Sequence, residues 1–594
     1  MKLDTNKRYA GLFVPVFAIR TGSDLGVGDV TGLKQMLKWS AANQFQVLQI
    51  LPINETSDDN SPYNAISSQS IDITTLSFRE NDIPGYEEHD LEKLVSYEEL
   101  KSLNVGPVQY RKVKQLKLEI CRLAFERNLK NPDWEQSDAQ YAFQVFQEEE
   151  SEWLAPYVVF RALMARYDGT PVWEQWAQEH QSPEAIKNWL QSANEADAMA
   201  FEKECEFYAF VQWLLFRQWE SVRVLADEIG VALMGDIPFG VSRSSADVWA
   251  EPDLFNLAWG GGAPPEPLFA SDAFTVKWGQ NWGVPVYNWD EHKKDNYVWW
   301  RRRIHAVTRF FHVFRLDHVL GFYRIFAFPW QPHENWKYVD MEPEQVKEQL
   351  GNLPHFIPAS DDTEEGMKMN QKQGEQLLRM VIDAAGSAAI IAEDLGMVPD
   401  YVRPSLQSLG ISVFKIPVFT RQEWDKEYIH PEKYPLLSLS TLSTHDHQTM
   451  GQMWKEWWRL FDRSQAEDSV TDDEKQNGIY ASWELYRTLR FAKMDDRELM
   501  RDFMPSVHLN VIRRLMESQS WMVVLMITDL FNWDLRFNVP GPASESNWSE
   551  RLPSSISELR LDVEADRVLR EVHQMIEVSD RMAEVVEEVE IEII

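Results

Sequence analysis

The sequence is poor in cysteine, in basic charge and in long apolar runs. Only 2 of its 594 residues are cysteines, Cys121 and Cys205. Both lie in charged segments of helical pattern without metal-ligand spacing, so they indicate inert thiols and not a disulfide scaffold. The N-terminus is charged and has no apolar signal core, and no apolar run is long enough to span a bilayer. We therefore expect a cytoplasmic protein with no membrane partner.

Basic residues are heavily outnumbered. The chain has 59 Lys and Arg against 94 Asp and Glu, a net charge of −35. This charge repels nucleic acid, so we expect no nucleic-acid partner and a neutral ligand instead. The 25 tryptophans are mostly expected in the core, but such an excess also suits a cleft that stacks on sugar rings. The sequence gives no signal for an oligomeric state.

Eight apolar segments with polar ends predict the fold. Helical patterns separate them, which is typical of a (β/α)₈ TIM barrel with its active site at the C-terminal ends of the strands. The predicted strands lie within residues 11–17, 47–54, 231–241, 311–322, 387–396, 411–417, 436–446 and 521–530.

The length of the chain predicts large insertions in this barrel. Residues 86–230, between strands two and three, place apolar residues at helical spacing among many charges, and they predict a helical insertion subdomain. Residues 244–287 are rich in Gly, Pro and Trp and predict an irregular lid or wall. Residues 556–594 predict a charged helical tail. All of these belong to a single catalytic barrel over 1–594.

The segment 311–322 is the centre of the pattern. Arg315 and Asp317 are two residues apart on a strand and therefore share a face. A carboxylate beside a fixed guanidinium stays ionised, which suits a nucleophile or a charge stabiliser better than a proton donor. A structural ion pair at a strand end would explain the two residues equally well. We expect Gly321 to end the strand and to let backbone approach a ligand.

Further acids end other strands. Asp236 ends strand three, Asp446 ends strand seven and Asp529 ends strand eight. Strand five ends in Glu393 and Asp394, and strand alternation lets only one of them face the barrel mouth. Glu393 is the longer, and its apolar surroundings predict the raised pKa of a general acid. Several carboxylates with many aromatics favour retaining glycoside cleavage, followed by transfer to water or to a sugar hydroxyl.

Parts of the sequence also match the patterns of other functions. His318, His445 and His447 raise the possibility of a divalent-metal hydrolase, but HExxH is missing. The glycine-rich turn at 22–28 lacks the spacing of a nucleotide site. An α-glucan hydrolase with the same acids and a catalytically dead glucan-binding protein stay open as alternatives.

Nine short motifs together resemble one family, the amylomaltases or disproportionating enzymes, which are 4-α-glucanotransferases of the α-amylase clan. The motifs are LGVGD (25–29), SPY (61–63), GDIP (235–238), SADVW (245–249), QNWG (280–283), FRLDH (314–318), AEDLG (392–396), THD (444–446) and NVPG (538–541).

The resemblance implies a retaining transfer of glucosyl or maltooligosyl units between 4-hydroxyls of maltose, maltooligosaccharides and soluble glucans. It implies Asp317 as nucleophile, Glu393 as acid/base and Asp446 as transition-state stabiliser, with no metal or organic cofactor. Arg315 and His445 would hold the nucleophile and a sugar hydroxyl. The subsites would be lined by Tyr63, Asp236, Phe269 and Trp282.

The chain departs from the family pattern in two places. His447 stands where an Asn usually follows the third acid, and the loop 266–269 reads EPLF where the family commonly has an Asp-Tyr-Phe run. Both departures concern acceptor-side contacts. The phrases VFAIR (16–20) and VLGFYRI (319–325) are similar to the plant cytosolic type. Because the first predicted strand lies directly at the start of the sequence, we expect none of the starch-binding modules of that type.

Overall fold

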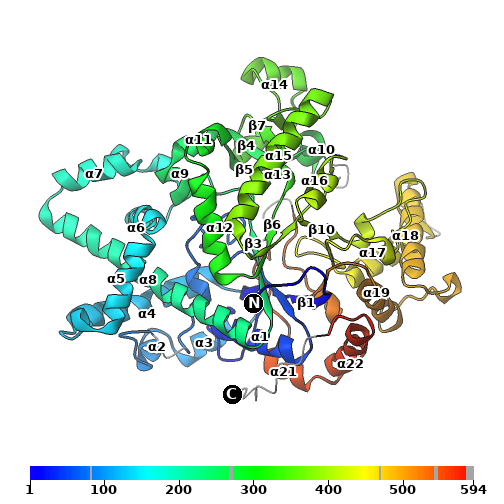
Figure 1. Cartoon of the computed structure of the whole chain (residues 1–594), viewed down its shortest axis with the longest axis horizontal. Helices are drawn as coiled ribbons and strands as arrows, with labels where there is room; N and C mark the ends of the chain where they lie inside the picture. The colour runs from blue at the N-terminus through cyan, green and yellow to red at the C-terminus, as the bar shows by residue number, and fades with distance from the viewer. Residues whose placement is uncertain (80–82, 266–271, 467–469, 541–545, 583–594) are drawn as a thin grey trace.

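The computed structural model contains the predicted barrel (Figure 1). It describes residues 1–79, 83–265, 272–466, 470–540 and 546–582, apart from the side chain of Glu498. Eight parallel strands close in the order β1-β12-β11-β10-β9-β6-β3-β2. They are β1 (Tyr9–Phe13), β2 (Val47–Gln49), β3 (Ala232–Ile237), β6 (Val313–Leu316), β9 (Ala389–Ala392), β10 (Ser412–Lys415), β11 (Ser438–Ser440) and β12 (Met522–Met526). The TIM-barrel prediction is confirmed, with one strand in each of the eight predicted segments.

The strand register explains why the acids meet at one end. Asp236 on β3 pairs with Arg315 on β6, and Leu316 on β6 pairs with Ala392 on β9. The residues that follow these pairs therefore leave the barrel side by side. Parallel strands place all their C-terminal ends at the same rim.

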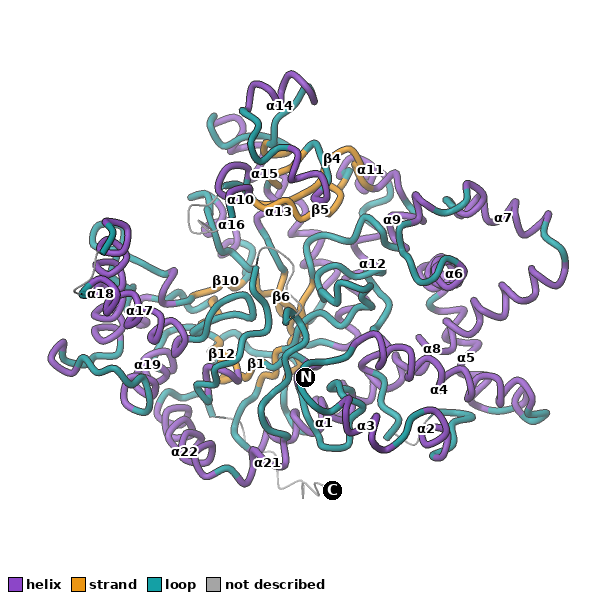
Figure 2. Tube along the Cα trace, turned by 180° about the vertical axis from the view of Figure 1, so that it is seen from behind, coloured by secondary structure: helices purple, strands orange, loops and turns teal. Residues whose placement is uncertain are grey.

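Seven α-helices lie between β2 and β3 in the part of this segment that the structure describes. They are α2 (His89–Leu94), α3 (Tyr97–Leu103), α4 (Tyr110–Lys130), α5 (Asp138–Glu149), α6 (Ser151–Arg166), α7 (Pro183–Ser192) and α8 (Glu195–Glu228). Figures 1 and 2 show α7 and the start of α8 reaching away from the barrel on one side. The buried side chains of α4, α6 and α8 join those of the barrel in one hydrophobic cluster. The limits of a separate subdomain at 86 and 230 stay a prediction.

A second sheet stands beside the barrel mouth. Its strands pair antiparallel in the order β5-β4-β7-β8, with bounds β4 (Phe255–Ala263), β5 (Gln280–Tyr287), β7 (Ile325–Phe328) and β8 (His355–Ile357). The expectation of an irregular wall over 244–287 was therefore wrong for β4 and β5. The glycines that suggested irregularity let strands approach closely, since a Cβ on Gly262 would lie 1.9 Å from the Gln280 carbonyl oxygen.

The remaining helices surround the barrel and form the end of the chain. None of the helices in the described segments is long and apolar enough to cross a membrane. The helices are α1 (Val30–Ala42), α9 (Ala246–Ala250), α10 (Ala273–Trp278), α11 (Trp289–Lys294), α12 (Val298–Phe310), α13 (Leu320–Tyr323), α14 (Pro343–Leu350), α15 (Glu364–Ala385), α16 (Val402–Ser408), α17 (Met450–Ser464), α18 (Asp472–Phe491), α19 (Ser506–Met516), α20 (Ile527–Leu530), α21 (Ile556–Leu561) and α22 (Val563–Val578). Of the predicted tail, residues 583–594 lie outside the described residues.

Gly321 has a different role from the one predicted. Strand β6 ends at Leu316, and Gly321 lies five residues later, inside α13. A Cβ at this position would come within 2.6 Å of the Phe239 ring. The ring of Phe239 in turn lies against His318, with centroids 6.0 Å apart. The glycine thus makes room for an aromatic ring behind the catalytic rim.

Gly321→Ala should lower the free energy of unfolding by about 1–3 kcal/mol, because an added methyl group overpacks this contact. The measurement is urea denaturation followed by tryptophan fluorescence. In a double-mutant cycle with Phe239→Leu, the smaller side chain should relieve part of the loss. Strictly additive effects would show that the two positions do not compete for space.

Candidate active site

Arg315 lies at the centre of the polar cluster at the barrel mouth. Its Nη1 donates to both carboxylate oxygens of Asp236, at 2.9 and 2.8 Å. Its Nη2 lies 2.8 Å from Oδ1 of Asp317. The guanidinium is buried, so a buried positive charge holds two carboxylates in fixed positions.

Asp317 directly follows β6 and is the more accessible of the two acids. Its side chain is 25% exposed, whereas that of Asp236 is fully buried. Its backbone N–H donates to the Ile237 carbonyl, 3.0 Å away, which continues the β3–β6 ladder by one residue. Asp317 is therefore fixed by backbone and by Arg315 while its carboxylate still meets the mouth.

The next residue links Asp317 to Glu393. His318 has a φ of 41°, an uncommon backbone conformation for a residue other than glycine. Its N–H donates to Oε2 of Glu393 at 2.9 Å, and the N–H of Leu395 donates to Oε1 at 2.9 Å. Two backbone amides thus position the Glu393 carboxyl beside Asp317.

Burial gives Glu393 the properties of an acid/base group. Burial, opposed by Arg315 and assisted by the Asp317 charge, raises the pKa of Glu393 to about 7. A carboxyl with this pKa exchanges a proton near neutral pH. The Asp394 carboxylate points away from the mouth. Its Oδ2 accepts a hydrogen bond from Arg403 of α16 at 2.7 Å, and its Oδ1 accepts one from the Phe414 N–H at 2.8 Å. The prediction that only Glu393 of the two faces the mouth is confirmed.

The third acid, Asp446, is held in its charged form. His445 Nε2 lies 3.2 Å from its Oδ2, and the Asn538 amide donates to Oδ1 at 2.6 Å. Burial on its own would raise the pKa of Asp446, but His445 and Asn538 outweigh it and hold that pKa well below the usual range. Asp446 therefore stays a carboxylate where Glu393 is able to hold a proton.

Aromatic rings form one wall of the site. Tyr63 stacks on His445 with ring centroids 5.3 Å apart, and Trp548 lies 5.7 Å from Tyr63 and 5.6 Å from His445. The Tyr63 hydroxyl donates to Asp236 at 2.7 Å. Burial raises the pKa of Tyr63 well above its ordinary value, so the hydroxyl remains a donor.

Trp282 stands on the other side, on β5. It is 40% exposed, and its ring meets His318 edge-on with centroids 4.8 Å apart. Because His318 follows Asp317, this indole lies near Asp317, and its exposed area is suited to stacking on a sugar ring. The predicted subsite residue Phe269 and the departing loop 266–269 lie outside the described residues.

His447 belongs to the same rim. Its Nδ1 lies 2.7 Å from the Thr444 hydroxyl, and its ring contacts Phe419 at 4.9 Å. Burial lowers the pKa of His447 to about 4. The residue that replaces the usual Asn is therefore a neutral ring that packs beside Asp446.

The acid of the eighth strand does not join this cluster. The Asp529 carboxylate accepts hydrogen bonds from the Ser443 hydroxyl and from the Met450 N–H. It therefore holds the beginning of α17 in place. The expectation that all five strand-end acids face the mouth is wrong for Asp529, because strand eight passes into the short helix α20 before the acid is reached.

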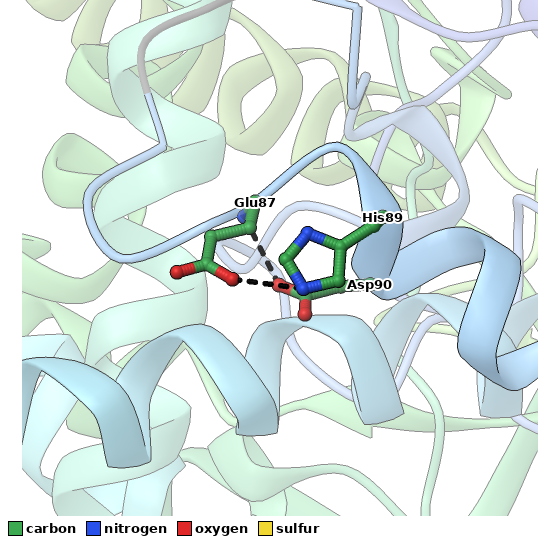
Figure 3. Close-up of side chains that lie close together, drawn as sticks. All are labelled: Glu87, His89 and Asp90. Atoms are coloured by element: carbon green, nitrogen blue, oxygen red, sulfur yellow. Dashed lines mark hydrogen bonds and ion pairs between the residues drawn. The ribbon is translucent and has the colours of Figure 1, made fainter.

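The possible metal-ligating atoms of the described residues do not form a cluster at the barrel mouth. Among the residues that the structure describes, only Glu87, His89 and Asp90 bring three possible ligand atoms within 4.8 Å of one another (Figure 3). This group lies at the start of α2, where the Asp90 carboxylate is engaged by Arg127 at 2.8 and 2.9 Å. The three histidines of the metal-hydrolase alternative do not form such a group.

Sequence reasoning missed several contacts of the site. Asn538 belongs to the NVPG motif, but the sequence predicted no role for it. The sequence also predicted no role for Trp548 or for the His318 amide. A single-sequence pattern carries no signal for Trp548, because the segment that brings it to Tyr63 is irregular. The positive φ of His318 likewise follows from the tertiary contacts of Glu393.

Comparison with known proteins agrees with this site. The family model described as 4-alpha-glucanotransferase matches residues 14–557. The chain belongs to the 4-alpha-glucanotransferase family. It is 30% identical over 557 residues to the 4-alpha-glucanotransferase of Chlamydia caviae, covering 92% of this chain and 91% of the relative. It is 35% identical over 329 residues to 4-alpha-glucanotransferase DPE2 of Oryza sativa subsp. japonica, covering 54% of this chain and 32% of the relative.

Solved structures of similar fold are amylomaltases. The amylomaltase from Streptococcus agalactiae in complex with acarbose superposes with a TM-score of 0.71 at 20% identity, covering 97% of this chain and all of the other. That from Corynebacterium glutamicum gives a TM-score of 0.74 at 19% identity, covering 96% and 75%. The family establishes the reaction class, a retaining 4-alpha-glucanotransferase of glycoside-hydrolase type.

Arg315→Lys should lower kcat for maltotriose disproportionation by about 100-fold. An ammonium cannot bind Asp236 in two-pronged fashion and Asp317 together, and a small displacement of the attacking group is costly. Initial rates of glucose release measure the effect. The control is Arg459→Lys, a 65%-exposed surface position paired with Glu456, which should leave kcat unchanged. Equal rates in the two variants would remove Arg315 from its positioning role.

Proposed function

We propose that Asp317, Glu393 and Asp446 carry out the transfer as nucleophile, general acid/base and charge stabiliser. The observation that supports this assignment most directly is the contrast between the carboxyls: burial raises the pKa of Glu393 to about 7, whereas hydrogen bonding keeps Asp446 ionised. Two carboxyls with opposite protonation preferences suit acid and anion roles.

In the first step, one Asp317 oxygen attacks the anomeric carbon of the donor glucan while Arg315 holds the other oxygen. Glu393 gives its proton to the departing glycosidic oxygen, so the C–O bond breaks as the carboxylate–sugar bond forms. Asp446 lies where its charge would favour the oxocarbenium-like transition state and accept hydrogen bonds from sugar hydroxyls.

In the second step, Glu393 acts as the base. It takes the proton from the 4-hydroxyl of an acceptor, and that oxygen displaces Asp317 from the anomeric carbon. Two inversions restore the original α configuration. Tyr63, Trp282 and His445 would contact the sugar rings, and the acceptor would be glucose or a maltooligosaccharide. Phe269 stays a proposed subsite residue on sequence grounds alone.

Incubation with maltotriose tests these roles. The native enzyme should produce glucose together with a ladder of longer oligosaccharides. Chromatography of the products over time measures both. Asp317→Asn should abolish the ladder, and Glu393→Gln should slow it by about 10²–10⁴-fold, the usual contribution of a general acid. Glucose and maltose without longer products would instead identify a hydrolase, and full activity of Asp317→Asn would refute the assignment of the nucleophile.

The pH profile tests the acid role of Glu393. In the free enzyme, the carboxyl must be protonated for the first step, so kcat/KM should fall as pH rises through about 7. A maltosyl fluoride donor, whose leaving group needs no protonation, should lose this alkaline fall and should restore the first step in Glu393→Gln. An alkaline fall that is identical for both donors would assign the titration to another group.

A further inference from the structure

Exposed aromatic side chains gather on one surface outside the catalytic cluster. Four are involved, from the segment after β10 and from α18: Phe419 (48% exposed), Trp424 (79%), Tyr480 (44%) and Trp483 (54%). Most tryptophans of this protein are buried, and exposed apolar area that is concentrated in one place marks a binding surface. These four residues are called the aromatic surface below.

Two arginine contacts show that the members are neighbours. The Arg487 guanidinium lies 5.6 Å from the centroid of the Trp483 ring, and its Nη2 donates to the carbonyl of Asp425 at 3.4 Å. Asp425 is the residue after Trp424, so Arg487 ties the backbone of the loop that carries Trp424 to the helix that carries Trp483. Arg421 and Glu484 act electrostatically on the Tyr480 hydroxyl, which places Tyr480 beside the same loop.

A buried carboxylate holds the aromatic surface in shape. Glu484 is fully buried and accepts hydrogen bonds from Arg421 at 2.8 and 3.0 Å, from Arg487 at 2.6 Å and from the Tyr428 hydroxyl at 2.7 Å. These bonds join the 421–428 loop to α18. They also pair the charges of Arg421 and Arg487 with the Glu484 carboxylate. Preformed rings bind a ligand without the entropy cost of ordering them.

The surface is continuous with the catalytic rim. Phe419 contacts His447, the residue after Asp446, with ring centroids 4.9 Å apart. Two residues further along the chain, Arg421 begins the contacts with Glu484. Figure 1 shows α17 and α18 on the side of the barrel opposite α7. Phe419 therefore contacts the rim at one end of a loop whose next residues are bound to α18.

We propose that this aromatic surface binds an α-1,4-glucan chain that extends out of the catalytic mouth. The inference rests on the proposed function and assigns the enzyme a preference for long glucans. Flat rings stack on the C–H faces of pyranoses, and the paired local charges suit a neutral chain. A strongly acidic protein of net charge −35 also disfavours an anionic partner.

The test compares a long and a short substrate in the double variant Trp424→Ala/Trp483→Ala. With glycogen as donor and glucose as acceptor, kcat/KM should fall about tenfold, which corresponds to the loss of about 1.4 kcal/mol of stacking. Maltotriose disproportionation should stay within about twofold of the native rate, since a trisaccharide in the mouth does not reach α18. The matched control is Tyr141→Ala, which removes a 70%-exposed ring from the distant helix α5 and should change neither rate.

Other outcomes would overturn the proposal. An equal fall on both substrates would give the two tryptophans a structural role, and unchanged rates on glycogen would remove them from binding. If the native enzyme were a dimer by size-exclusion chromatography and the double variant a monomer, the surface would be a subunit interface.

A direct binding measurement separates this inference from the proposed function. Migration in native gels containing glycogen should be retarded for the native enzyme and for Tyr141→Ala, but much less for the double variant. This readout needs no turnover. Absence of any maltotriose conversion would defeat the proposed function, whereas equal retardation of all three proteins would defeat the aromatic surface.

Discussion

The guanidinium of Arg315 is the interaction on which the catalytic rim depends. It is buried, and it binds Asp236 on the neighbouring strand and Asp317 beyond the end of its own strand. A buried charge is stable only when it is paired, so the three groups must be present together. Tyr63 completes the arrangement through its bond to Asp236. Loss of one member would leave an unpaired charge in the barrel as well as a misplaced nucleophile.

The same rim controls three carboxyls by three different means. Asp317 is oriented by an ion pair and remains partly open to the mouth. Glu393 receives two backbone amide hydrogen bonds, which favour the charged form, yet burial dominates and its pKa rises. Asp446 is more exposed, with 36% of its side chain accessible to solvent, and it has His445 and Asn538 as partners, so its pKa falls. Surroundings, and not residue type, decide which carboxyl holds a proton.

The barrel was predictable from sequence because parallel strands that are buried on both faces are apolar along their length. Each of the eight apolar segments also ended in polar residues, which marked the C-terminal end of its strand. Strand alternation is a local rule, so it predicted that only one of Glu393 and Asp394 faces the mouth, and the longer side chain and apolar surroundings of Glu393 favoured that residue. Gly321 and Asp529 were misinterpreted since each lies beyond a strand end, in a short helix that breaks the period of two. Strands β4 and β5 of the second sheet were missed because their glycines are typical of loops. Asn538 and Trp548 reach the site from a distant irregular segment, so only the tertiary fold reveals them.

The hydrogen bond between the His318 amide and Glu393 has an evolutionary consequence. The donor is a main-chain N–H, so the bond holds Glu393 beside Asp317 without using the side chain of residue 318. Any residue that tolerates a φ of 41° leaves this bond intact. Selection can thus vary the side chain that faces Trp282, and with it the sugar contacts, while the stereochemical course of the reaction is inherited unchanged.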